Sequence, residues 1–557
     1  MKSLHNILRS VAVVASVSAI CIPDIALRAE TTEASKPTSM HVFRKGYDWP
    51  KVSSYPLKRL DSIVARSGSN PDRLLFASRD KAQYIYLDSI ERYEFGHNVP
   101  TVYITTDTRV FDVTSKVDYL SGVITMHGYG AYEDFDTTEM QIRGRGNSTW
   151  FLPKKPYRVK FGKKQSLAGM KKAKNYVLIA NYLDPTLMRN PLAFRMAQLM
   201  DMPWTNHAVP VNVWFNGFFK GAYMLSEKVG INAGSVDIEE ETAIMWELDQ
   251  SFDEDYKFYS AGYDLPVMVK DPDPADFCDE DAGETPELWL AEWQVDFENM
   301  ERAVREGRAH EVIDISTAVD YFLVNNVAGN HEINWPKSTY LYKEKVDDLY
   351  SFGPVWDFDW AFGYEQPVDA PLIGRSLPGY RFMVDIMKDE EFMPLFEEKW
   401  ARFRDEVFPM VLEYFDEYAA TVRISALQDG EQWPTLDRED APLAISSEQF
   451  DVKVPELRAW LIDRVAAIDA DPLHLLYAEL PDQPDPDEPD PDEPDPDEPD
   501  PDQPDPDQPD PDEPDPDQPD PDQPEPDESD PSDSSDSFEQ PEQPDSDQSA
   551  SSDFQPE

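Results

Sequence analysis

The sequence feature that most limits what this chain can fold into is a long acidic repeat, rich in proline, at its C-terminal end. From residue 481 to residue 557 the chain runs through PDPDEP and PDPDQP units and then through a mixture of Ser, Asp and Gln. This stretch holds 23 of the 50 prolines and 33 Asp or Glu residues, with no Lys or Arg. Proline lacks a backbone donor and like charges repel each other, so neither helices nor sheets are expected. The sequence therefore predicts a disordered, polyproline-II-rich spacer over residues 476–557.

The charge of the remaining chain limits its partners. The formal net charge is −60, and without the 33 acidic residues of the repeat the first 480 residues still carry −27. Nucleic-acid binding depends on basic patches that meet phosphates, so no nucleic-acid partner is expected. Hydrophobic residues make up 40% of the sequence, which suffices for a large core. The presence of only two cysteines, Cys21 and Cys278, excludes a disulfide framework.

The N-terminus has the pattern of an export signal. Residues 1–10 are basic, and the apolar run at residues 11–22 is too short to span a bilayer comfortably. We expect a secretory signal peptide over residues 1–29, cleaved after Ala29 or after Ala19. Cys21 stands where a lipoprotein cysteine would, but the residues before it make a poor lipobox. The protein is predicted to be secreted or held at the cell surface, without a transmembrane segment.

The pattern of apolar residues changes along the body of the chain. Residues 30–96 form an unassigned lead, and residues 97–475 are predicted to be one large two-lobed domain. Period-two and β-branched runs predict strands or hairpins at residues 99–107, 154–161, 175–182, 211–229, 243–249, 265–273 and 338–362, with a turn at Asn216 and Gly217 and a loop at residues 141–150. Helices are expected at residues 184–200, 288–307, 317–328, 389–423 and 454–470. Those at residues 288–307 and 317–328 are expected to be amphipathic, and Asp184 is the expected N-cap of the first helix. A strand-rich first half and a helix-rich second half predict an α+β fold.

Two aspartates interrupt an aromatic run, GPVWDFDWAFGY, at residues 353–364. Burying an unpaired carboxylate is expensive, so Asp357 and Asp359 need a cation, a metal or a shared proton. Hard oxygen ligands suit Mg²⁺, and phosphate chemistry also needs cationic donors. Candidate donors on nearby loops and strands are Arg143, Arg145, Lys160 and Lys228, with Glu227 beside the last. The structural alternatives are a turn aspartate with a salt-bridged partner, arginines paired with the acidic body, and a solvent-facing Lys160.

Five stretches occur in a fixed order: RGRGNSTW, PKKPYRVKF, FNGFFKGAYMLSEKV, KSTYLYK and GPVWDFDWAFG. Together they resemble the CotH (spore-coat protein H) kinase family, from about residue 99 to about residue 470. The resemblance implies an atypical protein-kinase-like fold with ATP and Mg²⁺ (or Mn²⁺) as cofactors. It implies transfer of phosphate to protein hydroxyls, here on an envelope or extracellular protein.

The family motifs assign roles to individual residues. The WDFD motif matches residues 356–359, which implies Asp357 and Asp359 as metal ligands, the former in the role of the Asp of a DFG motif. The strand lysine matches Lys160, with Lys155 as a rival, and the SEK motif places Glu227 where it could pair with a phosphate-binding lysine. The full implied cofactor-binding set is Arg143, Arg145, Lys155, Lys160, Glu227, Lys228 and Lys337. Glu247, Asp249 and Lys270 fall where the family often has similar residues.

One element departs from the family pattern. In GNHEINWPKS, residues 329–338, Glu332 stands where an Asn-x-Asp catalytic element has its aspartate, and Asn334 is close by. These two are the catalytic candidates, although a reacting group misplaced by about 1 Å can cost a large factor in rate. Two functions therefore stay open: a secreted ATP-dependent phosphotransferase, or a kinase-like surface adhesin or scaffold without turnover. Glycoside hydrolysis ranks third, because nothing fixes two carboxylates at the separation it requires.

Overall fold

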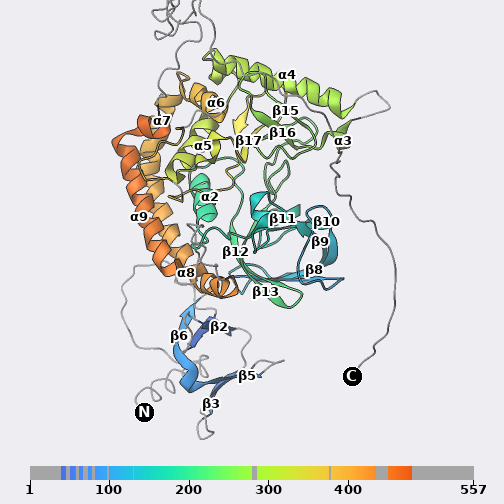
Figure 1. The fold of residues 1–557 in the computed structure, drawn as a ribbon, viewed down its shortest axis with the longest axis vertical. Coiled ribbons are helices and arrows are strands. Elements are labelled where there is room, and N and C mark those ends of the chain that lie inside the picture. The colour runs from blue at the N-terminus through green and yellow to red at the C-terminus, as the bar shows by residue number, and fades with distance from the viewer. Residues whose placement is uncertain are drawn as a thin grey trace, which may run out of the picture. The chain divides into compact units, whose positions relative to one another are not determined.

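The structure is a computed structural model that describes residues 39–44, 51–57, 62–66, 73–77, 82–96, 99–129, 131–278, 285–364, 366–374, 378–433 and 449–478. The predicted signal peptide and the acidic repeat from residue 479 onward lie outside the described residues. Strands dominate the first half of the described chain and helices the second, so the predicted α+β class is confirmed (Figure 1). None of the described helices combines the length and apolarity needed to cross a membrane.

The unassigned lead contains two small antiparallel sheets. The first has the order β2-β1-β6, with strands Lys51–Pro56, Ser39–Arg44 and Ile90–Gly96. The second has the order β3-β4-β5, with strands Ser62–Arg66, Arg73–Ala77 and Ala82–Tyr86. Tyr55 and Phe76 stack with ring centroids 3.9 Å apart, so aromatic packing joins the two sheets in one small core.

Seven strands close into a barrel in the order β10-β11-β13-β12-β7-β8-β9. Their bounds are Thr101–Thr106 (β7), Leu120–His127 (β8), Phe135–Gly144 (β9), Tyr157–Gln165 (β10), Ala173–Ile179 (β11), Val209–Phe215 (β12) and Phe218–Glu227 (β13). Alternate residues such as Tyr157, Val159 and Phe161 point inward and fill the barrel, as the period of two requires. The hairpin turn is confirmed, with positive φ at Asn216 (49°) and Gly217 (89°).

The predicted loop at residues 141–150 is wrong at its start. Residues 141–144 extend β9, because Ile142 is fully buried opposite Val159 and continues the apolar alternation. A short turn then leads into the 3₁₀ helix Ser148–Phe151. Because β9 continues as far as Gly144, Arg143 lies on a strand rather than in a loop.

A second, five-stranded sheet has the order β15-β16-β14-β17-β18. Its strands are Lys257–Tyr259 (β15), Pro266–Asp271 (β16), Ile244–Leu248 (β14), Thr339–Lys343 (β17) and Ser351–Phe352 (β18). The strands predicted at residues 243–249 and 265–273 are confirmed, and the hairpin predicted at residues 338–362 is confirmed only as far as Phe352, since no strand follows at residues 353–362. Because β14 lies between β16 and β17, Glu247 is flanked by Met268 and Tyr340, which are far apart in sequence.

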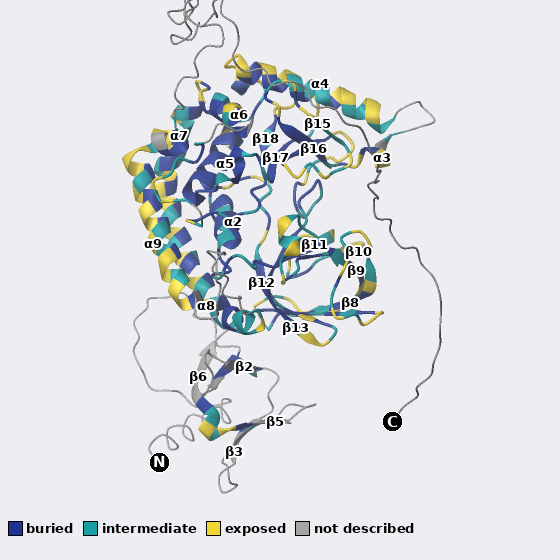
Figure 2. Cartoon of the chain, in the orientation of Figure 1, coloured by how far each residue is buried: buried dark blue, intermediate teal, exposed yellow. Residues whose placement is uncertain are grey.

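Helices cover this sheet and one side of the barrel (Figure 1). They are Arg189–Leu199 (α2), Pro274–Phe277 (α3), Pro286–Arg305 (α4), Ile315–Ala328 (α5), Pro378–Met387 (α6), Phe392–Arg402 (α7), Phe408–Gln432 (α8), Gln449–Ala470 (α9) and Pro472–Leu476 (α10). The helices expected near residues 288–307, 389–423 and 454–470 are confirmed. The segment 317–328 is helical but not amphipathic, since α5 is buried along almost its whole length, whereas α4 and α9 expose one face (Figure 2).

The first predicted helix begins later than expected. Asp184 is not its N-cap, because the carboxylate accepts N–H bonds from Thr186, Met188 and Arg189 within a turn. Leu187 in that turn has a positive φ of 58°, which is incompatible with a continuing helix. Consequently α2 starts at Arg189, and Asn190 lies in its first turn.

Candidate active site

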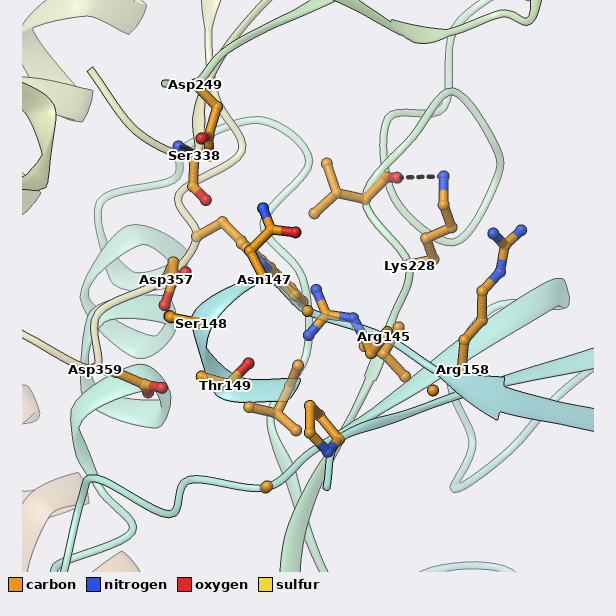
Figure 3. Close-up of a pocket in the computed structure, with 18 of the residues that line it drawn as sticks. Arg145, Asn147, Ser148, Thr149, Arg158, Lys228, Asp249, Ser338, Asp357 and Asp359 are labelled. Atoms are coloured by element: carbon orange, nitrogen blue, oxygen red, sulfur yellow. Dashed lines mark hydrogen bonds between the residues drawn. The ribbon is translucent and has the colours of Figure 1, made fainter. Parts of the chain in front are cut away.

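A cavity of about 410 Å³ lies between barrel strands β9–β11 and strands β14, β16 and β17 of the five-stranded sheet. Asp249, Asp357 and Asp359 lie on one side of the cavity in Figure 3, and Arg158 and Lys228 lie on the other. Arg145 and Asn147 lie between the two groups. The turn between Arg145 and Asn147 requires glycine at position 146, because its φ is +84° and an added Cβ would meet Thr149 Oγ1 at 2.4 Å.

The carboxylates come from a segment anchored by aromatic side chains. Trp356 and Phe358 are buried, and Trp356 stacks on Phe194 of α2 with ring centroids 5.5 Å apart. Asp357, between them, has a φ of 61°, a left-handed conformation that Asp adopts more readily than most residues. Alternating anchors and carboxylates thus hold Asp357 and Asp359 at the cavity.

Asn190 of α2 clamps this segment. Its Nδ2 donates to Asp359 Oδ1 at 2.5 Å, and its Oδ1 accepts from the backbone N–H of Phe358 at 2.8 Å. Asn190 is only 4% exposed, so both bonds are shielded from water. One side chain therefore fixes a backbone position and a carboxylate orientation together.

Burial raises the proton affinity of both aspartates. Burial and the neighbouring charge of Asp357 raise the pKa of Asp359 to about 7. Burial also raises the pKa of Asp357, although Lys337 and Arg145 oppose that rise. A carboxylate pair in this position is stabilised by a bound cation, because each member repels the charge of the other.

Four of the cations that line the cavity, Arg143, Arg145, Arg158 and Lys228, have no carboxylate partner among the described residues. Arg143 and Arg158 are directly opposite each other on β9 and β10, an arrangement of like charges that costs free energy. Burial lowers the pKa of Arg145, and burial together with Lys270 lowers the pKa of Lys228 to about 8. Within the described ranges, no carboxylate lies at ion-pairing distance from any of the four. In a chain with 110 acidic and 50 basic residues, such unpaired cations indicate an anion-binding site.

Lys270 and Glu247 form a second charged group at the cavity. Lys270 Nζ lies 2.5 Å from Glu247 Oε2 and 3.3 Å from Glu254 Oε1, and Tyr340 donates to Glu247 Oε1 at 2.8 Å. Burial opposes the charge of Lys270, but the two carboxylates outweigh burial and raise its pKa. The lysine is therefore held charged at one fixed place.

Glu332 lies behind the cavity wall rather than in it. It belongs to the 3₁₀ turn His331–Asn334, is 6% exposed, and accepts from Lys337 Nζ at 2.9 Å. Burial and the charge of Asp357 raise the pKa of Glu332 to about 8, although Lys337 opposes the rise. Lys337 itself lines the cavity and lies 4.9 Å over the ring of Trp360.

Six of the eleven predicted site residues line the cavity: Arg143, Arg145, Lys228, Lys337, Asp357 and Asp359. The other five do not. Lys155 donates to the Trp150 carbonyl, and Lys160 lies exposed over Tyr119 on the outer face of the barrel. Glu227 is fully buried and holds His207 through a backbone and a ring nitrogen. Asn334 donates to the carbonyls of Leu372 and His331.

Arg158 and Asn190 are cavity residues that the sequence analysis does not single out. Arg158 shares a strand face with Lys160, so the same alternation that favoured Lys160 also allowed Arg158. Asn190 is separated from Asp359 by 169 positions, and no local signal connects the two. The only local indication that Asn190 could reach a functional site is its position near the start of a helix that follows a buried strand.

A comparison with family models identifies a relationship over most of the domain. The model of the CotH kinase protein family matches residues 142–468, which is more than half of the chain and includes all eleven predicted site residues. A search of curated proteins finds no match. On the strength of the family match, the chain belongs to the CotH kinase protein family.

Proposed function

We propose that this protein is a secreted, metal-dependent phosphotransferase that moves the γ-phosphoryl group of ATP to a hydroxyl of an envelope or extracellular protein. The observation that carries the proposal is the arrangement of charge in the cavity, where Asp357 and Asp359 lie across from Arg158 and Lys228, two cations with no carboxylate of the described residues at ion-pairing distance. Phosphoryl transfer needs these two groups, since cations bind the phosphates and hard oxygens bind the metal. Membership of the CotH kinase family supports the same reading. In this proposal the barrel and the helix-covered sheet act as two kinase-like lobes around the nucleotide.

Asp357 and Asp359 would hold Mg²⁺ or Mn²⁺ only in company with the nucleotide. Within the described part of the chain, no group of three or more His, Cys, Asp or Glu side chains could hold a metal ion. Mg²⁺ is commonly bound through one or two carboxylates plus substrate phosphates and water, which fits this pair. The bound metal would neutralise charge that develops on the phosphate oxygens.

The cationic side would position the triphosphate. Arg145 and Arg158 offer planar guanidinium groups suited to paired contacts with phosphate oxygens, and Lys228 adds a point charge. Lys270, fixed by Glu247, would add a further donor from the sheet side. Transfer itself then depends chiefly on alignment and charge stabilisation, with little covalent work for the protein.

The transfer step has a simple balance. The acceptor hydroxyl oxygen forms a bond to the γ-phosphorus, and the bond from that phosphorus to the bridging oxygen breaks, so ADP leaves with the electron pair. The hydroxyl proton would pass to the ionised form of Glu332, the buried carboxylate that pairs with Lys337. Glu332 would reach the acceptor only after a movement of the Lys337 side chain.

Thermal unfolding of the full-length chain with ATP and Mg²⁺ or Mn²⁺ tests the nucleotide site. A ligand present at 100 times its Kd adds about 2.7 kcal/mol to the folded state. The wild type should be stabilised, Asp357→Asn should not, and the exposed control Asp347→Asn should behave as the wild type. Absence of stabilisation in the wild type with both metals would refute the proposal.

One observation favours the second candidate, a kinase-like scaffold or adhesin without turnover. Glu332 is tied to Lys337 and does not line the cavity, so the base needed for transfer is displaced. The distinguishing result would be nucleotide binding that persists while no phosphate reaches any acceptor protein or the chain itself.

A further inference from the structure

The barrel carries an unusual concentration of positive charge. Between Glu139 and Asp184 the sequence has 11 Lys or Arg residues and no Asp or Glu, although acidic residues outnumber basic ones 110 to 50 over the chain. Six lysines of this segment are exposed: Lys160, Lys163, Lys164, Lys171, Lys172 and Lys174. Only Lys171 has a carboxylate at ion-pairing distance within the described residues, namely Asp237 at 3.2 Å. An acidic protein thus has one segment with a strong excess of positive charge.

Two of these lysines, Lys164 and Lys174, line a second cavity of about 510 Å³ that adjoins the first. Besides Lys270, which is paired with Glu247, five basic residues line this cavity, and we call them the basic wall: Arg143, Arg158, Lys164, Lys174 and Lys228. Three members of the basic wall, Arg143, Arg158 and Lys228, also line the first cavity. A chain bound along the basic wall would therefore lead directly to the site proposed for phosphate.

Six carboxylates also line the second cavity: Glu240, Glu254, Asp255, Asp271, Asp273 and Asp276. Half of these carboxylates already have a hydrogen-bond or ion-pair partner. Glu254 pairs with Lys270, Asp271 accepts from the N–H of Ile231 at 2.8 Å, and Asp273 caps α3 through the N–H of Ala275. On the basic wall, Arg143, Arg158 and Lys228 donate only to neutral oxygens, namely those of Lys116, Asn175 and Val229. No carboxylate of the described residues lies at ion-pairing distance from the basic wall, so its positive charges are available to a ligand.

We propose that the phosphoryl acceptor is an acidic peptide, with Asp or Glu flanking a serine or threonine, bound along the basic wall. The transfer step rests on the function proposed above, but the binding of the peptide does not. Charge complementarity would steer such a peptide to the basic wall and raise its association rate. Because the rest of the body is acidic, the same peptide would be repelled elsewhere, which adds specificity.

A suitable probe is the 11-residue peptide DESDPSDSSDS, a sequence found in this chain at residues 527–537 with five serines and five acidic residues. Binding of the labelled peptide to the full-length protein is measured by fluorescence anisotropy at low salt. A matched peptide with Asn and Gln in place of Asp and Glu should bind at least about tenfold more weakly. Raising the salt to about 0.5 M should weaken the acidic peptide, since exposed charges are screened.

Charge reversal locates the surface. Lys164→Glu with Lys174→Glu should weaken peptide binding at least about tenfold, because both side chains lie on the basic wall. The control reverses Lys345 and Lys388, two exposed lysines outside both cavities, and should leave binding within about twofold. Neither Lys164 nor Lys174 lines the first cavity, so nucleotide-induced stabilisation should be unchanged in the double variant.

The outcomes separate the two proposals. Equal binding of the acidic and neutral peptides, or unchanged binding after reversal of Lys164 and Lys174, would overturn this inference and leave the nucleotide site untouched. Stronger binding of an oligonucleotide of equal charge would also overturn it. Mass spectrometry measures phosphate transfer from ATP to the peptide. Peptide binding without transfer would support the basic wall as a binding surface and refute the phosphotransferase. Faster phosphorylation of a lysine-flanked serine peptide than of the acidic peptide would support the phosphotransferase and refute an acidic acceptor.

Discussion

Replacing Asn190 tests how the segment that carries Asp357 and Asp359, the proposed metal ligands, is held. The Asn190→Ala change removes two buried hydrogen bonds at once, one to the Asp359 carboxylate and one from the Phe358 backbone. A bond to a charged group contributes about 1.5–3 kcal/mol, and a buried N–H left without an acceptor costs about 1–3 kcal/mol. Partial relaxation reduces the total, so the free energy of unfolding should fall by about 3 kcal/mol. Urea unfolding followed by tryptophan fluorescence measures this loss.

The functional consequence of the same change should exceed its effect on folding. Without the amide, the Asp359 side chain is free to rotate, and part of the binding free energy of the nucleotide and metal is lost in ordering it. Stabilisation by ATP and Mg²⁺ should then require about tenfold more nucleotide than in the wild type. Asn299→Ala, at an exposed position of α4, is the control and should stay within about 0.5 kcal/mol of wild type.

Asn190→Asp separates the two bonds. It keeps an acceptor for the Phe358 N–H and places a second carboxylate against Asp359. This variant should fold better than Asn190→Ala at acidic pH, where the two carboxyls can share a proton. If Asn190→Ala unfolds like the wild type and binds nucleotide equally well, the reasoning about this clamp is wrong.

Three further predictions follow from other charged groups. Lys154 is fully buried and lies 2.7 Å from Asp429, so Lys154→Ala should lower the free energy of unfolding in urea by about 3–5 kcal/mol, and a loss below about 1 kcal/mol would contradict the pairing. Arg158→Gln relieves repulsion between neighbouring arginines, so it should keep or raise the melting temperature without ligand and reduce the rise caused by ATP; an undiminished rise would remove Arg158 from the site. The hydrogen bond to Asp389 raises the pKa of His310, so the folded state binds that proton more tightly than the unfolded state. The resulting stability is fully present below about pH 6.5 and disappears as pH rises through the folded-state pKa, so His310→Gln should cost more at pH 5.5 than at pH 8.5 in urea titrations, and equal costs would exclude the linkage.

Local patterns in the sequence predicted many elements of the main domain, although not β8, β15 or α6, and they did not predict which elements are neighbours. Alternation identified β10 because Tyr157, Val159 and Phe161 all face the barrel interior. The same alternation assigns Lys160 and Arg158 to one outer face, yet it cannot say which of them lies near the cavity. That depends on how β9, β10 and the distant strands of the second sheet are placed, and such placement arises from long-range packing.

The same limit explains the site residues that lie elsewhere. Glu227 ends β13 in a motif that favours a role beside phosphate, but its side chain is turned toward His207 and is fully buried there. A charged residue at a strand end can face either side of the sheet, and its partner decides which. His207 precedes β12, the strand that pairs with β13, so the deciding contact is one that local sequence does not reveal.

The aromatic residues around Asp357 and Asp359 now have a physical explanation. Trp356 and Phe358 bury large apolar surfaces in the main core, which supplies the free energy that keeps two carboxylates partly out of water. Burial and mutual repulsion raise the pKa of both aspartates, so the unliganded site holds stored electrostatic cost. A divalent cation that arrives with a triphosphate would release that cost on one side and satisfy the unpaired cations on the other. Metal and nucleotide should therefore bind cooperatively, each raising the affinity of the other by the same factor, and independent binding in a calorimetric titration would contradict this account.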